Sequence, residues 1–171
     1  MSKTTVKFKK AGINDLYTIK EIAYATWPVT FGRIIPIRQI VYMLNKIYND
    51  NSLKEQILEK GHNFIMAKKD NKPVGFTSYE LNYNSEPQLM IHKLYLLPGS
   101  QGSGIGTQFL NLLAQIAQQN NHKRLRLKVY YQNDIAIRFY EKYGFIIAGR
   151  ETTDTGNNYI ILDNVMVKDL Q

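Results

Sequence analysis

Three glycines occupy alternate positions in the middle of the chain, between a strand-like segment and an apolar, helix-like segment. They are Gly102, Gly104 and Gly106, within the stretch PGSQGSGIGTQFLNLLAQIAQQ at 98–119. Glycines before a helix let the backbone close around a ligand without a Cβ in the way. The N-terminus of a helix also presents unpartnered N–H groups and partial positive charge, which together attract anions. The stretch therefore predicts a phosphate-binding turn, with a flexible glycine-rich loop as the alternative.

Two common phosphate motifs do not fit this stretch. A dinucleotide fingerprint that began at Gly102 would need a further glycine at position 107, where the chain has Thr107. A P-loop would end in Gly-Lys-Ser or Gly-Lys-Thr, whereas Gly106 is followed by Thr107 and Gln108. If the turn binds phosphate, it therefore belongs to another class of site.

The remaining sequence predicts an α+β fold with a mixed sheet. Strand composition or alternation marks residues 4–11, 63–68, 73–82, 88–97, 124–129, 145–150 and 159–167. Helical spacing and capping residues predict helices from Asn14 or Asp15, from Pro36, from Ser52 to about Lys60, over 104–120, and from Asn133 to Gly144. The three adjacent strands at 63–97 indicate an antiparallel meander, and the strand–helix–strand unit at 88–129 indicates one parallel pair.

Length and composition indicate a single cytoplasmic domain over residues 1–171. No run of 18 or more apolar residues is present, and no apolar core of a signal peptide follows the basic segment MSKTTVKFKK. The absence of cysteine excludes disulfides, thiolate metal sites and a cysteine nucleophile, and it fits the cytosol. Because no histidines or carboxylates pair at ligand spacing, we expect no metal. His62 and His122 lie at the ends of predicted elements, where we expect them to be exposed.

The net charge of +8, from 22 basic and 14 acidic residues, favours an anionic partner. Such a partner is a phosphate-rich cofactor, nucleic acid or a membrane surface; a merely lysine-rich surface is the alternative. The longest basic run is His122 to Arg124, so no nucleic-acid-binding arm is visible. A nucleic-acid-binding strand with Arg124, Arg126 and Lys128 on one face is a minor hypothesis, because such a strand is usually a solvated face.

The glycine stretch fits the signature Gln/Arg-x-x-Gly-x-Gly/Ala, as Gln101-Gly102-Ser103-Gly104-Ile105-Gly106. Together with 91-IHKLYLLP-98 and 133-NDIAIRFYEKYGF-145, it resembles the GCN5-related N-acetyltransferases over about residues 5–168. The resemblance implies that family's fold, with a mixed, mostly antiparallel central sheet of about seven strands and helices on both faces. It also implies an acetyl-CoA-dependent N-acetyltransferase.

The resemblance further implies where acetyl-CoA binds: in a gap where the strands at 88–97 and 124–130 separate. The pantetheine arm would pair with the strand edge at Leu94, Tyr95 and Leu96, and Asn133 would hydrogen-bond the same arm, unless it serves only as a helix cap. The diphosphate would accept hydrogen bonds from backbone N–H groups of Gln101, Gly102, Ser103, Gly104, Ile105, Gly106 and Thr107.

Three side chains are candidates for the catalytic groups that such a reaction needs. Tyr140 matches the family tyrosine that protonates the departing thiolate, although a core aromatic would show the same spacing. His92 matches a strand position where some relatives place a histidine base, and alternation puts it on the face of Met90, Leu94 and Leu96. A half-buried structural histidine is the alternative, and Glu80 on the neighbouring strand is the second candidate base.

The partner is expected to be a small-molecule or peptide amine, with no nucleic acid and no membrane. Trp27, Phe31, Tyr42 and Met43, within 24–44, either wall the amine pocket or pack in the core. A polyamine acceptor is disfavoured by the positive net charge. A CoA-binding regulatory module without turnover is the alternative function. The apolar segment 157–169 is a candidate sheet edge for a homodimer.

Overall fold

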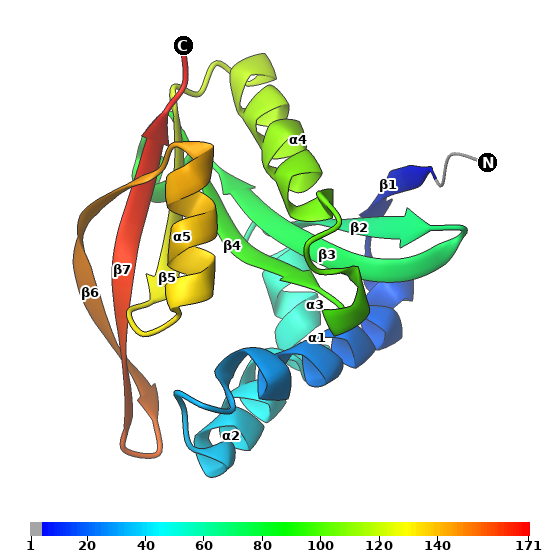
Figure 1. Cartoon of the computed structure of the whole chain (residues 1–171), viewed down its shortest axis with the longest axis vertical. Coiled ribbons are helices and arrows are strands. Elements are labelled where there is room, and N and C mark those ends of the chain that lie inside the picture. The colour runs from blue at the N-terminus through cyan, green and yellow to red at the C-terminus, as the bar shows by residue number, and fades with distance from the viewer. Residues whose placement is uncertain (1–4) are drawn as a thin grey trace.

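The computed structural model describes residues 5–171, so residue 4, where we expected the first strand to begin, lies outside the described part. Within that part, one seven-stranded sheet has the order β1-β2-β3-β4-β5-β7-β6 (Figure 1). The strands are β1 Val6–Ala11, β2 Asn63–Lys69, β3 Lys72–Leu81, β4 Gln88–Leu96, β5 Arg124–Tyr130, β6 Ile146–Gly156 and β7 Tyr159–Asp169. The helices are α1 Leu16–Phe31, α2 Ile37–Ile47, α3 Asp50–Leu58, α4 Ile105–Gln119 and α5 Asp134–Tyr143.

The sheet is mixed, and helices cover both of its faces. Neighbouring strands are antiparallel except β4 and β5, which are parallel. Side chains of α1, α2 and α3 pack in one core cluster, and those of α4 and α5 pack in clusters on the opposite face. The predicted fold class, with its meander and its single parallel pair, is confirmed.

Alternation along β5 explains how one strand serves two layers. Leu125, Leu127 and Val129 are buried in the cluster beneath α4 and α5, whereas Lys128 and Tyr130 point to the α1 side. Each fully buried leucine or valine contributes roughly 1.5–3 kcal/mol of transfer free energy. The polar residues between them therefore line the opposite face without weakening the core.

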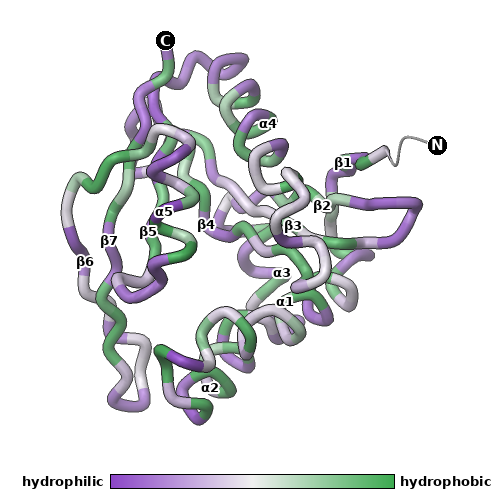
Figure 2. The backbone as a smooth tube through the Cα atoms, viewed as in Figure 1, coloured by the Kyte–Doolittle hydropathy of each residue, from purple (hydrophilic) through white to green (hydrophobic). Residues whose placement is uncertain are grey.

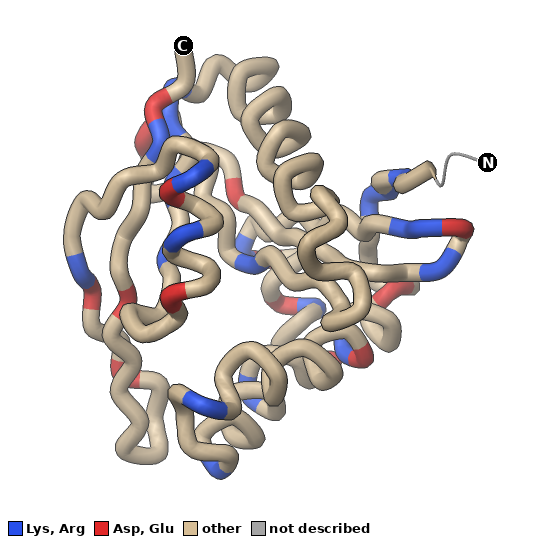
Figure 3. The backbone as a smooth tube through the Cα atoms, in the orientation of Figure 1, with Lys and Arg blue, Asp and Glu red and all other residues tan. Residues whose placement is uncertain are grey.

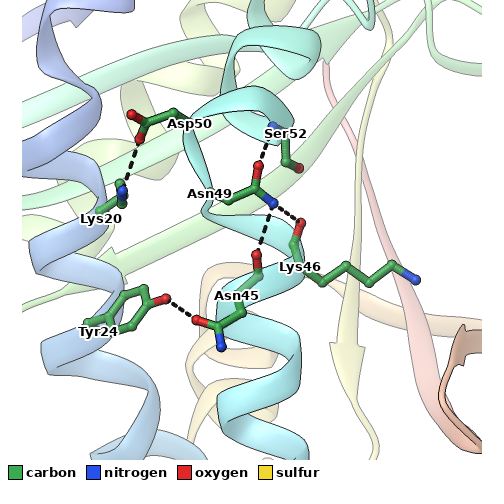
Figure 4. A network of polar contacts seen from close by, with 7 residues as sticks. All are labelled: Lys20, Tyr24, Asn45, Lys46, Asn49, Asp50 and Ser52. Carbon is green, nitrogen blue, oxygen red and sulfur yellow. Dashed lines mark hydrogen bonds and ion pairs between the residues drawn. The ribbon is translucent and has the colours of Figure 1, made fainter.

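Helix α1 follows its predicted cap Asp15 and continues through Pro28 to Phe31. The start of α3 differs from the expectation. Helix α3 begins at Asp50, because the Asn49 side-chain oxygen accepts the Ser52 N–H at 2.9 Å and so caps the helix earlier than the expected Ser52 (Figure 4). Figure 4 also shows the polar contacts that tie α1 to α3 and α2, Lys20 to Asp50 at 2.9 Å and Tyr24 to Asn45 at 2.7 Å.

The last two strands form a longer hairpin than we expected. Strand β6 runs to Gly156 rather than to position 150, because its polar stretch 151–156 pairs with β7. The expectation that 157–169 forms a sheet edge is wrong, since β7 lies between β5 and β6. The edge strands are β1 and β6.

Part of the positive charge lies on the hairpin that joins β2 and β3. This hairpin is hydrophilic (Figure 2) and carries Lys68, Lys69 and Lys72 around Asp70 (Figure 3). In Figure 1 it projects from the side of the sheet opposite to β6 and β7. Part of the net positive charge therefore lies on a hairpin at one end of the sheet, away from the β6–β7 hairpin.

Candidate active site

Strands β4 and β5 separate part of the way along their length (Figure 1). Their parallel pairing extends only from Gln88 opposite Arg124 to Ile91 opposite Leu127. Beyond that point β4 continues to Leu96 and β5 continues to Tyr130, and no other strand of the described chain pairs with β4 on this side. The edge of β4 at residues 92–96 can therefore accept an extended ligand as an added strand.

The turn into α4 presents free backbone donors at the end of this gap. Gly104 is the N-cap of α4 at φ 82°, and Gly102 has φ 73°, conformations that L side chains rarely adopt. Within residues 5–171, no hydrogen-bond acceptor takes the N–H groups of residues 102–107. Position 106 favours glycine, because a Cβ there would lie only 3.0 Å from the Phe139 ring of α5.

This turn fits a diphosphate held by the main chain alone. The segment 94–107 contains no charged residue, and the turn is uniformly uncoloured in Figure 3. An anion would therefore be held by the N–H groups and by the positive end of α4. Gln101, the first residue of the signature, instead reaches back through its side chain to the Leu96 carbonyl at 3.3 Å.

Tyr140 of α5 places its ring in the hydrophobic core, and its hydroxyl has no hydrogen-bond partner among the described residues. The residue is 9% exposed, and its ring contacts those of Phe139 and Phe145. Its hydroxyl makes no hydrogen bond to any described residue. Burial raises the pKa of the Tyr140 phenol, so the group stays protonated at neutral pH and can donate its proton.

Asn133 caps α5, as the sequence predicts, because its Oδ1 accepts the Ala136 N–H at 3.3 Å. The cap leaves the side-chain NH₂ without a described partner. Gly144 ends the same helix at φ 111°. One asparagine can therefore act as a cap and also donate to a ligand.

The aromatic residues expected near the acceptor are mostly core residues. Trp27, Phe31 and Met43 are buried together with the α1–α3 cluster. Tyr95 of β4 joins them, with its ring 6.2 Å from that of Trp27, and its pKa is raised by burial and then by the nearby Tyr140 hydroxyl. Tyr42 is half-buried and donates to the Thr155 carbonyl at 2.8 Å, which ties α2 to the β6–β7 hairpin.

His92 lies at an irregularity that simple alternation could not reveal. Ile91 pairs with Tyr79 and Lys93 pairs with Ser78, so His92 is an extra residue in β4. His92 contacts residues on the α3 side, whereas Leu94 packs against the cluster of α4. The prediction that His92 shares a face with Leu94 and Leu96 is wrong, because the bulge shifts the alternation.

Two candidate bases are hydrogen-bonded to each other. His92 Nε2 and Glu80 Oε2 are 2.8 Å apart, and the ring of His62 stacks on His92 at 3.9 Å between centroids. Burial, and then the nearby charges of Lys93 and Lys128, lowers the pKa of His92 to about 3. Burial raises the pKa of Glu80. His92 is therefore neutral at pH 7 but a weak base.

The expectation that His62 and His122 are exposed is wrong. His62 is half-buried under His92, and burial, then His92 and nearby lysines, lowers its pKa to about 3. His122 is buried and its Nε2 accepts the Asn82 N–H at 3.0 Å. Spacing along the sequence gave no sign that His62, Glu80 and His92 would converge, with their ligand atoms all within 4.8 Å of one another.

The geometry of this trio does not favour a metal ion. The two histidine rings are nearly parallel, 10° apart, so their in-plane lone pairs lie in separate stacked planes. The positive charges of Lys60 and Lys93 also act on the cluster. That no metal binds here stays a prediction.

Sequence reasoning missed two ionisable residues on the same face. Lys93 is 9% exposed and donates to Gln56 Oε1 at 2.6 Å, and burial lowers its pKa to about 7. Asp163 of β7 lies opposite Tyr130 in the β5–β7 ladder, and burial raises its pKa to about 6. How deeply Lys93 of β4 and Asp163 of β7 lie depends on packing between strands and helices that are distant in the sequence.

Two of the three basic residues on this face of β5 are already in ion pairs. Arg124 pairs with Asp169 at 2.6 Å and Lys128 pairs with Glu151 at 2.5 Å, while the Nε of Arg126 is buried. Charges that are already paired contribute little to an electrostatic surface for nucleic acid. No helix of the described chain has the length and apolar character required to cross a bilayer.

Comparisons with known proteins agree with this geometry. The profile of the Acetyltransferase (GNAT) family matches residues 17–145. The spermidine N(1)-acetyltransferase of Thermoplasma acidophilum is 28% identical over 161 residues, which cover 92% of this chain and 96% of that protein. N-alpha-acetyltransferase 50 of Danio rerio is 29% identical over 134 residues, 77% of this chain and 75% of that protein.

Solved structures extend the likeness to the whole chain. The structure of the PaiA N-acetyltransferase from Thermoplasma acidophilum in complex with coenzyme A superposes with a TM-score of 0.81 at 25% identity, covering 97% of this chain and 99% of that one. The splayed strands, the amide turn and the family match point to the same conclusion. This chain belongs to the acetyltransferase (GNAT) family and is an N-acetyltransferase with acetyl-CoA as its co-substrate.

Proposed function

We propose that this chain transfers the acetyl group to a primary amine of a small molecule or peptide, by direct attack of the amine on the thioester. The observation that carries the proposal is the gap between β4 and β5, which has the donor-rich turn of α4 at its end and the Tyr140 hydroxyl in the cluster beside it. A thioester aligned along β4 would meet an amine that enters from the α1–α3 side.

The proposed binding roles follow the elements that line the gap. Backbone N–H groups of residues 102–107 bind the diphosphate, since the expected donor Gln101 N–H already donates to the Pro98 carbonyl at 3.4 Å. The β4 edge at 94–96 pairs with the pantetheine arm, and Asn133 donates to that arm. A β4 N–H in the same stretch stabilises the oxyanion. One such preorganised donor typically lowers the barrier by about 3–4 kcal/mol.

The proposed chemical roles use groups in suitable protonation states. Tyr140, a protonated phenol, supplies a proton to the departing thiolate of coenzyme A. His92, hydrogen-bonded to Glu80, is neutral and can accept a proton, directly or through water. Its pKa of about 3 limits how much a base at this position can contribute.

The acceptor side of the molecule has mixed charge, which bears on the choice of amine. A cleft of about 640 Å³ runs along α3 to His62, and Lys46, Lys60 and Glu55 are among its lining residues. Two lysines there disfavour a polycation at close range. We therefore propose a monoamine or a peptide amine ahead of a polyamine, although one relative is named for spermidine.

A thiol-release assay with acetyl-CoA tests the proposal. The panel contains a simple alkylamine, spermidine, an aminoglycoside and a peptide with a free N-terminus. Turnover with the alkylamine or the peptide supports the proposal, and turnover with spermidine alone would contradict the acceptor assignment. Binding of acetyl-CoA without turnover on any amine would instead support the regulatory module.

We also propose that the chain acts as one domain in the cytoplasm, without nucleic acid, membrane or metal. A homodimer would form through β6 rather than β7, because β6 is an edge strand with exposed Ile146 and Ile147. The loss of dimers in an Ile147→Lys variant, measured by sedimentation, would support this interface.

A further inference from the structure

An amine acceptor reaches the gap as an ammonium ion, so it needs a carboxylate to pair with and a group to take its proton. Two carboxylates of the neighbouring strands, Glu80 of β3 and Glu151 of β6, already have partners. Glu80 is hydrogen-bonded to His92 at 2.8 Å, and Glu151 is paired with Lys128 at 2.5 Å. Among residues 5–171, no hydrogen bond or ion pair reaches the carboxylate of Asp163.

The register of the sheet places Asp163 on the side of the gap where the acceptor would enter. Asp163 lies directly opposite Tyr130 of β5, and residues opposite each other in an antiparallel ladder share a face. Tyr130 and Ile161, two residues before Asp163, both pack against the α1–α3 cluster. Asp163 therefore faces the α1–α3 side, at the end of β5 that has separated from β4.

Charged and titratable groups from four elements surround this position. Burial raises the pKa of Asp163 to about 6; Lys128 of β5 lowers it and Glu151 of β6 raises it, both to a smaller extent than burial. Tyr130 lies opposite on β5. Beyond the larger effect of burial, the hydroxyl of Tyr140 on α5 and the carboxylate of Asp163 both raise the pKa of Tyr95 on β4, so the three groups lie close together.

We propose that Asp163 binds the ammonium group of the acceptor and removes its proton. This inference rests on the proposed function and adds a catalytic residue to it. Asp163 is better suited than His92, because a half-buried, unpaired carboxylate attracts a cation, whereas a neutral imidazole beside lysines does not.

The proton balance of the step closes without another reactant. The ammonium gives one proton to Asp163, and the free amine forms a bond to the thioester carbon. When the intermediate collapses, the C–S bond breaks, the nitrogen loses its second proton, and the sulfur receives one from Tyr140. The nitrogen proton restores the Tyr140 phenol through water, and Asp163 releases its proton to solvent.

The test compares Asp163→Asn with Asp169→Asn, which makes the same change on the same strand at an exposed ion pair far from the gap. For an alkylamine, kcat/KM of the wild type should stay level between pH 7 and 9, since the ammonium itself is used. In Asp163→Asn only the free amine reacts, so kcat/KM should be lower by roughly 10²-fold at pH 7 and should rise about tenfold per pH unit. Asp169→Asn should follow the wild type.

A second acceptor separates proton removal from simple damage. Trifluoroethylamine is already neutral at pH 8, so Asp163→Asn should turn it over nearly as fast as the wild type. A level pH profile in Asp163→Asn, or an equal loss with both amines, overturns the inference while leaving the proposed function intact. If the wild type turns over no amine although it binds acetyl-CoA, the proposed function itself fails.

Discussion

At the scale of single residues, burial determines which groups around the gap carry charge. It keeps Tyr140 protonated, and it lowers the pKa values of His62 and His92 to about 3 and that of Lys93 to about 7. In each case desolvation is the largest cause, because transfer from water disfavours the charged form. Burial therefore leaves Tyr140, His62 and His92 uncharged at pH 7.

Substitution of Tyr140 by phenylalanine should separate packing from chemistry. Tyr140→Phe removes a hydroxyl without a protein partner, so the melting temperature and acetyl-CoA affinity should be unchanged. Turnover should fall by roughly 10²-fold, because the thiolate loses its proton donor. The control is Tyr143→Phe on the same helix, whose hydroxyl contacts Asn111 at the surface and which should turn over normally. Equal turnover in the two variants would remove Tyr140 from the mechanism.

The stacked histidines should make the fold sensitive to acid. Their pKa values in the folded protein lie below the ordinary value of 6.5, so between pH 6.5 and 3 the unfolded chain binds more protons and stability falls as pH falls. One histidine contributes at most about 1.4 kcal/mol per pH unit, and less at His62, which water partly reaches.

Unfolding by urea from pH 8 to pH 4 measures this slope. His62→Gln should show a shallower fall in the free energy of unfolding than the wild type, with the two compared relative to pH 8. Parallel curves would show that His62 does not titrate with folding.

The placement of site residues was predictable only where local sequence determines it. The amide turn and Tyr140 lie in continuous motifs, so their positions were recognisable. The face of His92 was not, because it depends on a bulge between two strands. Asp163 was missed because its depth depends on β5 and β6, which flank it from distant parts of the sequence.

At the scale of elements, the backbone of the turn into α4 should matter more than any side chain in it. Gly104→Ala places a Cβ on a left-handed residue, which costs roughly 1–2 kcal/mol, so the turn should relax away from its binding shape. We expect acetyl-CoA to bind about tenfold more weakly. Gly99→Ala, in the same turn and with open space around its Cβ, should bind normally. Similar dissociation constants for the two variants would mean that the conformation of Gly104 is unimportant.

Element types were predictable, and element ends were less so. Apolar alternation gave β5, and Pro36 and Gly144 marked the ends of helices as observed. The length of β6 depends on pairing of polar residues with β7, which a single strand's composition cannot reveal. The start of α3 depended on a choice between Asn49 and Ser52, which are comparable caps.

At the scale of the whole molecule, function depends on one parallel pair in an otherwise antiparallel sheet. The helix that connects β4 to β5 must begin beyond the end of β4, so its N-terminus lies at the opening between the two strands. The sequence predicted this connection.

Titration calorimetry of the intact chain with acetyl-CoA tests the central claim, that the amides of residues 102–107 bind the diphosphate. We predict saturable heat with one site per chain, and stabilisation of about 2.7 kcal/mol at a ligand concentration of 100 times Kd, which raises Tm by roughly 5–10 °C. Dephospho-CoA, which keeps the diphosphate, should also bind, whereas pantetheine should bind far more weakly. No heat with acetyl-CoA and an unchanged Tm would contradict the account.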